Sequence, residues 1–190
     1  MMWLMKKDSG KNKSNPYVTS EYFRKVFVED MDDLYQLSFL LTGGNHQKAE
    51  QCFIAGLEDS VNTNAVFKEW ARTWAKRTII ENAIRALEPR QRQHANSSLP
   101  DHTAKIGARL PSVPNRDLAI SSVLALDDFE RFVFVIAVLE GYSEHRCALL
   151  LGSSVRDVRN ARIRATEHIA AAESRPIVAF HSSIRRGVAC

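Results

Sequence analysis

Hydrophobic positions along this chain recur mainly at spacings of three and four residues, with little alternation of apolar and polar positions. This period is typical of helices that bury one face, whereas strands alternate at every second residue. It predicts helices over about 21–41, 47–60 and 67–87, and then over about 118–125 and 127–139. A Thr-Gly-Gly-Asn turn over 42–45 is expected to end the first of them. The pattern therefore predicts an all-α protein.

A proline-rich stretch interrupts this pattern in the middle of the chain. Four of the six prolines lie between positions 89 and 114, among Gln, Asn, Ser and His. Proline removes a backbone donor and disfavours helix in the residue before it. We therefore expect two small helical domains, over 17–88 and 117–174, joined by a linker over 89–116 and followed by a tail over 175–190.

The stretch over 140–169 predicts two helices joined by a tight turn. Ser143 is placed to cap a short helix that runs to Leu151, Gly152 supplies the turn, and Ser154 is placed to cap a longer helix. The longer helix carries Arg156, Arg159, Arg162 and Arg164. A short scaffold helix followed by an arginine-rich helix is the arrangement of a helix-turn-helix that reads the major groove. Two amphipathic helices joined at a glycine give a similar pattern without binding DNA, so the motif alone leaves that alternative open.

The net charge, the cysteines and the apolar content indicate in which compartment the protein works. The 190 residues carry a net charge of +4, with a pI of about 9.1, which is compatible with a nucleic-acid partner but too weak to require one. Cys52, Cys147 and Cys190 form no paired framework and no close Cys-x-x-Cys pair, which indicates free thiols in a reducing compartment. No apolar run approaches the roughly 20 residues that span a membrane. We expect a cytoplasmic protein without membrane insertion.

The residue patterns of common catalytic and metal sites are absent from the sequence. The six histidines are scattered, and none belongs to a His-Glu-x-x-His set or a Cys/His cluster. Neither a Gly-x-x-x-x-Gly-Lys-Ser/Thr loop nor a Gly-x-Ser-x-Gly elbow is present. We therefore expect no catalytic residue, no metal site and no cofactor, and a protein that is not an enzyme.

Three passages resemble one known family. They are Asp33 to Gly43 followed by Ala49-Glu50, then Phe67 to Arg77, and finally Phe132 to Ala165. Together they resemble the bacterial RNA polymerase sigma factors of the small, two-domain extracytoplasmic-function group. The resemblance covers about 17–170, and its third passage, which matches the promoter-reading helix-turn-helix, is the most specific.

The resemblance implies a mechanism and partners. Sigma factors of this group bind the RNA polymerase core and direct it to promoter DNA. Their second domain reads the upstream promoter element as duplex. Their first domain captures the melted downstream element and binds the clamp of the core enzyme. An anti-sigma protein is a partner by family analogy alone.

In the second domain, helical spacing separates a buried stripe from candidate DNA contacts. The stripe comprises Val155, Val158, Ala165 and Ile169. The remaining residues in the first turns of this helix are expected to be exposed, and they are Arg156, Asp157, Arg159 and Asn160. Arginine can form two hydrogen bonds with guanine, and asparagine can do so with adenine. Arg164 and the amide groups near Ser154 are candidates for phosphate contacts, which position the protein without reading sequence.

In the first domain, the candidate DNA contacts are Arg72, Lys76 and Arg77, where Lys76-Arg77 replaces the Arg-Asn pair of the family. Single-stranded DNA binding uses a basic groove with aromatic platforms. Trp70 and Trp74 lie one helical turn apart, and tryptophans at this spacing more often anchor a core. We therefore expect Trp70 to be buried.

The sequence departs from the family at the passage that contacts polymerase. The family has Asp-Leu-x-Gln-Glu-x-Phe after the Ala-Glu pair, whereas this chain continues from Glu50 with Gln51, then Ile54 and Ala55. These four residues are the candidate polymerase contacts. Losing carboxylates and gaining apolar surface weakens a contact that depends on complementary charge. In the second domain, Arg162 stands where the family has an apolar residue.

Three functions remain open from the sequence. The first is a sigma factor that directs promoter-specific initiation. The second is a DNA-binding regulator of the same fold that no longer binds polymerase and needs only Arg156, Arg159 and Asn160. The third is a helical adaptor that binds proteins and not DNA.

Overall fold

The structure of the protein is a computed structural model that describes residues 16–63, 66–89 and 116–173. Within these ranges the regular secondary structure is helical and includes no strand, and one isolated bridge joins Tyr17 to Phe67. The all-α prediction is confirmed for this part of the chain. The expected tail lies outside the described residues, as does the expected linker except at positions 89 and 116.

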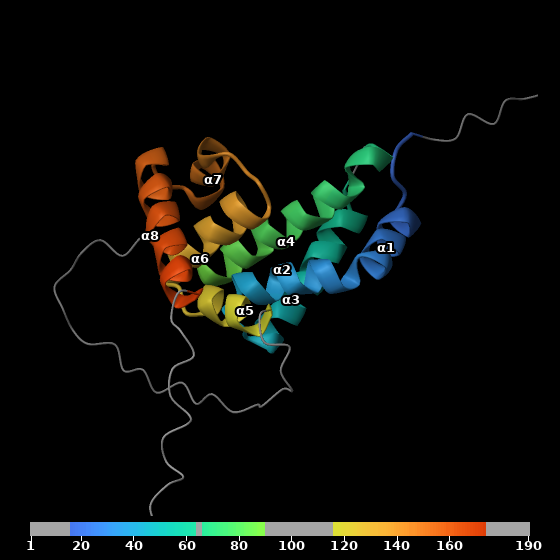
Figure 1. The fold of residues 1–190 in the computed structure, drawn as a ribbon. Coiled ribbons are helices and arrows are strands. Elements are labelled where there is room, and N and C mark those ends of the chain that lie inside the picture. The colour runs from blue at the N-terminus through green and yellow to red at the C-terminus, as the bar shows by residue number, and fades with distance from the viewer. Residues whose placement is uncertain (1–15, 64–65, 90–115, 174–190) are drawn as a thin grey trace, which may run out of the picture.

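The described helices fall into two stretches of sequence (Figure 1). The N-terminal segment (residues 16–63 and 66–89) contains α1 (Ser20–Glu29), α2 (Met31–Leu41), α3 (His46–Val61), the short 3-10 helix η1 (Lys68–Trp70) and α4 (Ala71–Leu87). The C-terminal segment (residues 116–173) contains α5 (Arg116–Leu124), α6 (Asp128–Val133), the π-helical turn η2 (Phe134–Leu139), α7 (Glu144–Leu151) and α8 (Val155–Glu173).

The helix expected over 21–41 is two helices, because the backbone leaves helical geometry at Asp30 (φ −106°, ψ 22°). Aspartate is a poor interior helix residue, since its short side chain competes for nearby backbone groups. The Asp30 carboxylate instead lies 2.8 Å from Arg72 Nε on α4. Met31, which a continuous stripe would bury, is 53% exposed, whereas Phe23 on α1 and Leu34 on α2 are buried. The break lets α1 and α2 bury separate faces.

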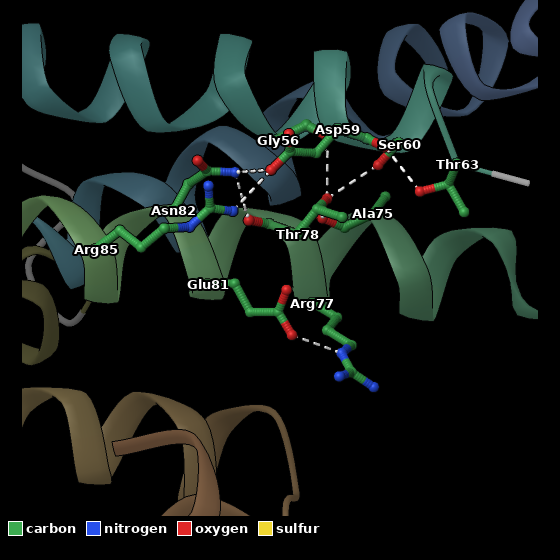
Figure 2. A network of polar contacts seen from close by, with 10 residues as sticks. All are labelled: Gly56, Asp59, Ser60, Thr63, Ala75, Arg77, Thr78, Glu81, Asn82 and Arg85. Atoms are coloured by element: carbon green, nitrogen blue, oxygen red, sulfur yellow. Dashed lines mark hydrogen bonds and ion pairs between the residues drawn. The ribbon is translucent and has the colours of Figure 1, made fainter. Parts of the chain in front are cut away.

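The interface between α3 and α4 contains a polar network (Figure 2). The Thr78 hydroxyl is buried and lies 2.9 Å from the Ser60 hydroxyl and 3.0 Å from the Gly56 carbonyl oxygen. The Asp59 carboxylate accepts hydrogen bonds from Asn82 Nδ2 at 2.9 Å and from Arg85 Nη2 at 2.8 Å. Buried hydroxyls need such partners, because an unpaired buried polar group is costly. The network therefore fixes how α3 lies along α4.

The turn after α2 brings the two segments together. Gly43 and Gly44 have φ values of 67° and 81°, which confirms the left-handed turn expected there. The Arg131 guanidinium of α6 packs over Gly43, with Nη2 3.0 Å from the position that a Cβ would take. Arg131 is 5% exposed and donates from Nη1 to the Leu126 carbonyl oxygen at 3.0 Å. A side chain at Gly43 would therefore meet both a strained backbone and a buried cation.

Buried residues of both segments belong to one hydrophobic core cluster. Helix α2 contacts α5, α6 and η2, and Figure 1 shows α5 and α6 against the N-terminal segment. Burial of apolar side chains is the main favourable term in folding. The N-terminal and C-terminal segments therefore share part of their core.

Candidate nucleic-acid interface

Helices α7 and α8 are joined by three residues, and local caps set both helix starts. The Ser143 hydroxyl accepts a hydrogen bond from the Arg146 amide at 3.3 Å. Gly152 ends α7 in left-handed geometry (φ 60°, ψ 36°). The Ser154 hydroxyl accepts from the Asp157 amide at 3.1 Å and donates to the Asp157 carboxylate at 2.7 Å. Asp157, expected to be exposed, is half-buried in this cap. The expected short helix, turn and longer helix are therefore present.

Helix α8 packs through a narrow apolar stripe. Val158 and Ala165 are fully buried, as expected, and Val155 and Ile169 are half-buried against the core. Ala161 is also fully buried, although it was not among the residues predicted for the stripe. Small side chains at positions 161 and 165 bring α8 close to its neighbours, which include α5, α6 and α7.

The opposite face of α8 is exposed. Arg156, Asn160 and Ile163 lie at helical spacings of four and three, which places them on the side away from the buried stripe. The side chains of Arg156 and Asn160 make no hydrogen bond or ion pair with other described residues. Ile163 is 48% exposed. We call these three residues the outward stripe; it presents donors and one apolar group, the chemistry that base edges require.

The remaining arginines of α8 are held by carboxylates from other helices. Arg159 Nη2 lies 3.0 Å and Arg162 Nη1 lies 3.4 Å from the carboxylate of Glu144, the first residue of α7. Arg164 pairs with Glu130 of α6. The arginine at position 162, where the family has an apolar residue, thus faces a partner of opposite charge.

The DNA-contact candidates of the N-terminal segment all lie on α4 and are all paired. Arg72 pairs with Asp30, and Arg77 pairs with Glu81 at 2.8 Å while its guanidinium lies 5.5 Å from the Trp74 ring centre. Lys76 Nζ lies 2.9 Å from Glu140 Oε2, across the two segments.

A cleft beside α4 is bordered by two of these cations and by three carboxylates. Arg72 and Lys76 line it together with Asp30, Asp33 and Glu140. A basic groove for a phosphate backbone needs an excess of positive charge, and this cleft has none. Tyr142 also lines it, and burial raises the pKa of the Tyr142 phenol.

The expectation that Trp70 is buried was wrong, since its side chain is 58% exposed. Trp70 lies in η1, before α4 begins, and so it lies outside the regular helix whose spacing suggested a core position. Its ring lies 5.5 Å from that of Phe67, which stacks on Tyr17 at 4.9 Å. All three rings are exposed. We call them the aromatic cluster.

The candidate polymerase contacts lie on the outer face of α3. Glu50, Gln51 and Ile54 are exposed and Ala55 is half-buried. The exposed fraction of Ile54 is 46%, and Glu50 and Glu58, one helical turn before and after it, are also exposed. This face is therefore available to a partner and combines one apolar side chain with two carboxylates.

Other chemistry is limited in the described part of the chain. Among the described residues, no three His, Cys, Asp or Glu side chains are grouped as metal ligands. Within the same ranges, no helix combines the length and apolar character needed to cross a membrane. Cys52 and Cys147 are buried free thiols, and burial raises the pKa of Cys147 to about 11. Such a thiol stays protonated at neutral pH and is a poor nucleophile.

The carboxylates that pair with the arginines could not be predicted from helical spacing. Glu144, Glu130 and Glu140 act across helices, and helical spacing reports only neighbours on the same helix. One residue in the sequence did point to such a carboxylate. Arg162 stands at a position expected to be apolar, and a partly buried cation there needs a nearby anion.

Comparison with known proteins returned neither a matching family model nor a matching curated protein.

Proposed function

We propose that this protein is a divergent sigma factor of the extracytoplasmic-function group, which directs RNA polymerase to specific promoters from the cytoplasm. Helices α7 and α8 act as its helix-turn-helix, with α8 in the major groove of the upstream element. The observation that carries the proposal is the outward stripe: Arg156 and Asn160 are exposed on one face of α8 and have no partner among the described residues. The resemblance over 17–170 supplies the polymerase part of the proposal.

The N-terminal segment offers two features that suit a melted promoter strand. The aromatic cluster presents exposed rings on which bases can stack, and stacking tolerates any base sequence. The side chain of Arg72 is 67% exposed although it pairs with Asp30, whose side chain is 20% exposed, so Arg72 remains accessible to a phosphate.

The outer face of α3 favours a second candidate, a DNA-binding regulator that does not bind polymerase. Gln51, Ile54 and Ala55 stand where the family has acidic and amide side chains, so charge complementarity to the polymerase clamp is reduced. The two candidates share the outward stripe and differ only at α3.

Binding to RNA polymerase core separates them. We expect the full chain to bind purified core and to support transcription from promoters whose upstream site it selects from random duplex DNA. Retained DNA binding without core binding at low salt would leave the regulator. Core binding should be weakened by Ile54→Lys, which places a charge on the exposed face of α3, while DNA binding stays unchanged. Binding to neither core nor DNA would leave only a protein-binding adaptor.

Arg156→Ala tests the DNA interface itself. Because Arg156 has no competing partner among the described residues, its loss should cost about 1–3 kcal/mol on the selected site if it reads a base. The measurement is a fluorescence-anisotropy titration on the selected site and on an unrelated duplex. Arg24→Ala on α1 is the control, since it removes the same charge from an exposed residue on another helix.

The pattern of loss assigns the role of Arg156. A loss confined to the selected site marks base reading, and an equal loss on both duplexes marks a phosphate contact. If Arg156→Ala and Arg24→Ala bind both duplexes equally well, α8 does not contact DNA through the outward stripe.

A further inference from the structure

Glu144 occupies an unusual place between α7 and α8. It is the first residue of α7, and its side chain is only 19% exposed. Arg159 donates a hydrogen bond from Nε to Glu144 Oε2 at 3.0 Å, and its Nη2 lies 3.0 Å from the same oxygen. Arg162 Nη1 lies 3.4 Å from Glu144 Oε1. One half-buried carboxylate thus holds two arginines of the neighbouring helix.

Helix geometry shows where this leaves the two arginines. Successive residues of a helix turn by about 100°, so Arg159 lies on the flank between the buried stripe and the outward stripe, whereas Arg162 lies at the edge of the buried stripe. Their guanidinium groups are directed to α7 through Glu144, whereas Arg156 and Asn160 lie on the side away from the core. One cation that flanks the outward stripe and a second at the edge of the buried stripe are therefore occupied.

Occupied cations act differently from free ones when DNA approaches. A free arginine gains affinity for any duplex by pairing with a phosphate, and this gain is independent of sequence. Glu144 competes with phosphates for Arg159 and Arg162, and its limited exposure makes its pairs less sensitive to salt than fully exposed ones.

We propose that Glu144 is a positioning residue that holds Arg159 and Arg162 against α7, so that sequence is read by Arg156, Asn160 and Ile163. The exposed Ile163 then offers an apolar contact to a thymine methyl group. Glu144 raises specificity by suppressing affinity for unrelated DNA. This inference rests on the proposed DNA binding of α8.

Glu144→Gln in the full chain is the first test, with titrations on the selected site and on an unrelated duplex at several salt concentrations. Releasing two arginines should tighten binding to the unrelated duplex and reduce the ratio of specific to unrelated affinity. The slope of log affinity against log salt should steepen by about one for each arginine that reaches a phosphate. Glu21→Gln on α1 is the control for net charge, and its slope should equal that of the native chain.

A second variant separates positioning from folding. Glu144→Leu combined with Arg162→Leu replaces the charged pair with an apolar pair and releases Arg159 alone. We expect this variant to keep the native melting temperature and still show a slope steeper by about one with reduced specificity. If it binds both duplexes as the native chain does, Glu144 has only a structural role and the inference fails.

The results also distinguish the inference from the proposed function. Failure of the native chain to bind any duplex at low salt would remove the proposed function and the inference with it. A different result would overturn only the inference and leave the proposed function intact. In that result the native chain binds its selected site specifically, and Glu144→Gln binds unrelated DNA no more tightly than the native chain does.

Discussion

Helices α3 and α4 pack closely at Gly56 of α3. A Cβ at this position would lie 2.6 Å from Ile79 Cγ1 and 3.2 Å from the Ile79 amide nitrogen of α4. Alanine is favoured over glycine in a helix by about 1 kcal/mol. The contact with backbone atoms cannot be relieved by rotating a side chain, however, and overpacking typically costs about 1–3 kcal/mol.

We therefore predict that Gly56→Ala lowers the free energy of unfolding by about 1–2 kcal/mol, because overpacking exceeds the gain in helix propensity. Urea unfolding followed by circular dichroism measures the change. Ala55→Gly, at the preceding and half-buried position, serves as the control, since it alters propensity without adding an atom. A stabilised Gly56→Ala variant would contradict the close packing of α3 on α4.

The burial and the pairing of single residues differ in how well the sequence predicts them. The burial of Val158 and Ala165 was predictable because both lie within a long regular helix, where spacing fixes the face. Trp70 was not, because it lies in the 3-10 turn before α4 and is exposed. The pairing of Arg159 with Glu144 was not predictable either, since it depends on how α7 crosses α8.

At the scale of elements, the contact between α3 and α4 depends on pH through Asp59. Hydrogen bonds from Asn82 and Arg85 lower the pKa of the Asp59 carboxyl below its ordinary value of 3.8. The folded state therefore binds the ionised form better than the unfolded chain does, so Asp59 stabilises the fold above that ordinary value. This contribution is lost as pH falls through the lowered pKa.

We predict that Asp59→Asn destabilises the protein at pH 7 and that the difference from the native chain disappears in strong acid. Thermal unfolding at a series of pH values from about 7 down to about 2 measures this, since the contribution of Asp59 declines as the pH falls below the ordinary pKa of an aspartate. Asp32→Asn on α2 is the control, because Asp32 is exposed and has no partner among the described residues. A constant difference across the series would mean that Asp59 acts through packing alone.

The helices themselves were largely predictable, and their interruptions were not. Helix α3 extends the expected range by one residue at each end, and α7 ends at Leu151 as expected from Gly152. Periodicity did not predict the break at Asp30, where a carboxylate on one helix pairs with Arg72 on another. The π-helical turn over Phe134–Leu139 was also unexpected, and it continues directly from α6.

At the scale of the whole molecule, the sequence predicts a linker over 89–116, most of which lies outside the described residues, and does not predict which helices pack together. The prolines between 89 and 114 separate the two groups of helices, and the structure places α2 against α5, α6 and η2. These contacts join residues far apart in the chain, such as Gly43 with Arg131 and Lys76 with Glu140. Patterns within one helix carry no information about such pairs.

The pair of Lys76 and Glu140 provides a measure of how the N-terminal and C-terminal segments are coupled. Its atoms are 2.9 Å apart, and the side chains are 38% and 14% exposed. Because Lys76 is half-buried and Glu140 is largely buried, we predict a coupling energy of about 0.5–3 kcal/mol, the range for residues in direct contact. A double-mutant cycle of Lys76→Met and Glu140→Gln, read by the free energy of unfolding, measures it.

Salt dependence identifies the origin of this coupling. If the ion pair joins the two segments, the coupling energy falls as the salt concentration rises toward about 1 M, where charges are screened within a few ångströms. Arg85→Met combined with Asp59→Asn is the matched cycle, because that ion pair lies wholly within the N-terminal segment. A Lys76–Glu140 cycle that is additive at every salt concentration would mean that other contacts, such as those of α2 with α5, α6 and η2, hold the two segments together. The Lys76 ammonium would then be available to a phosphate without any energetic cost to the fold.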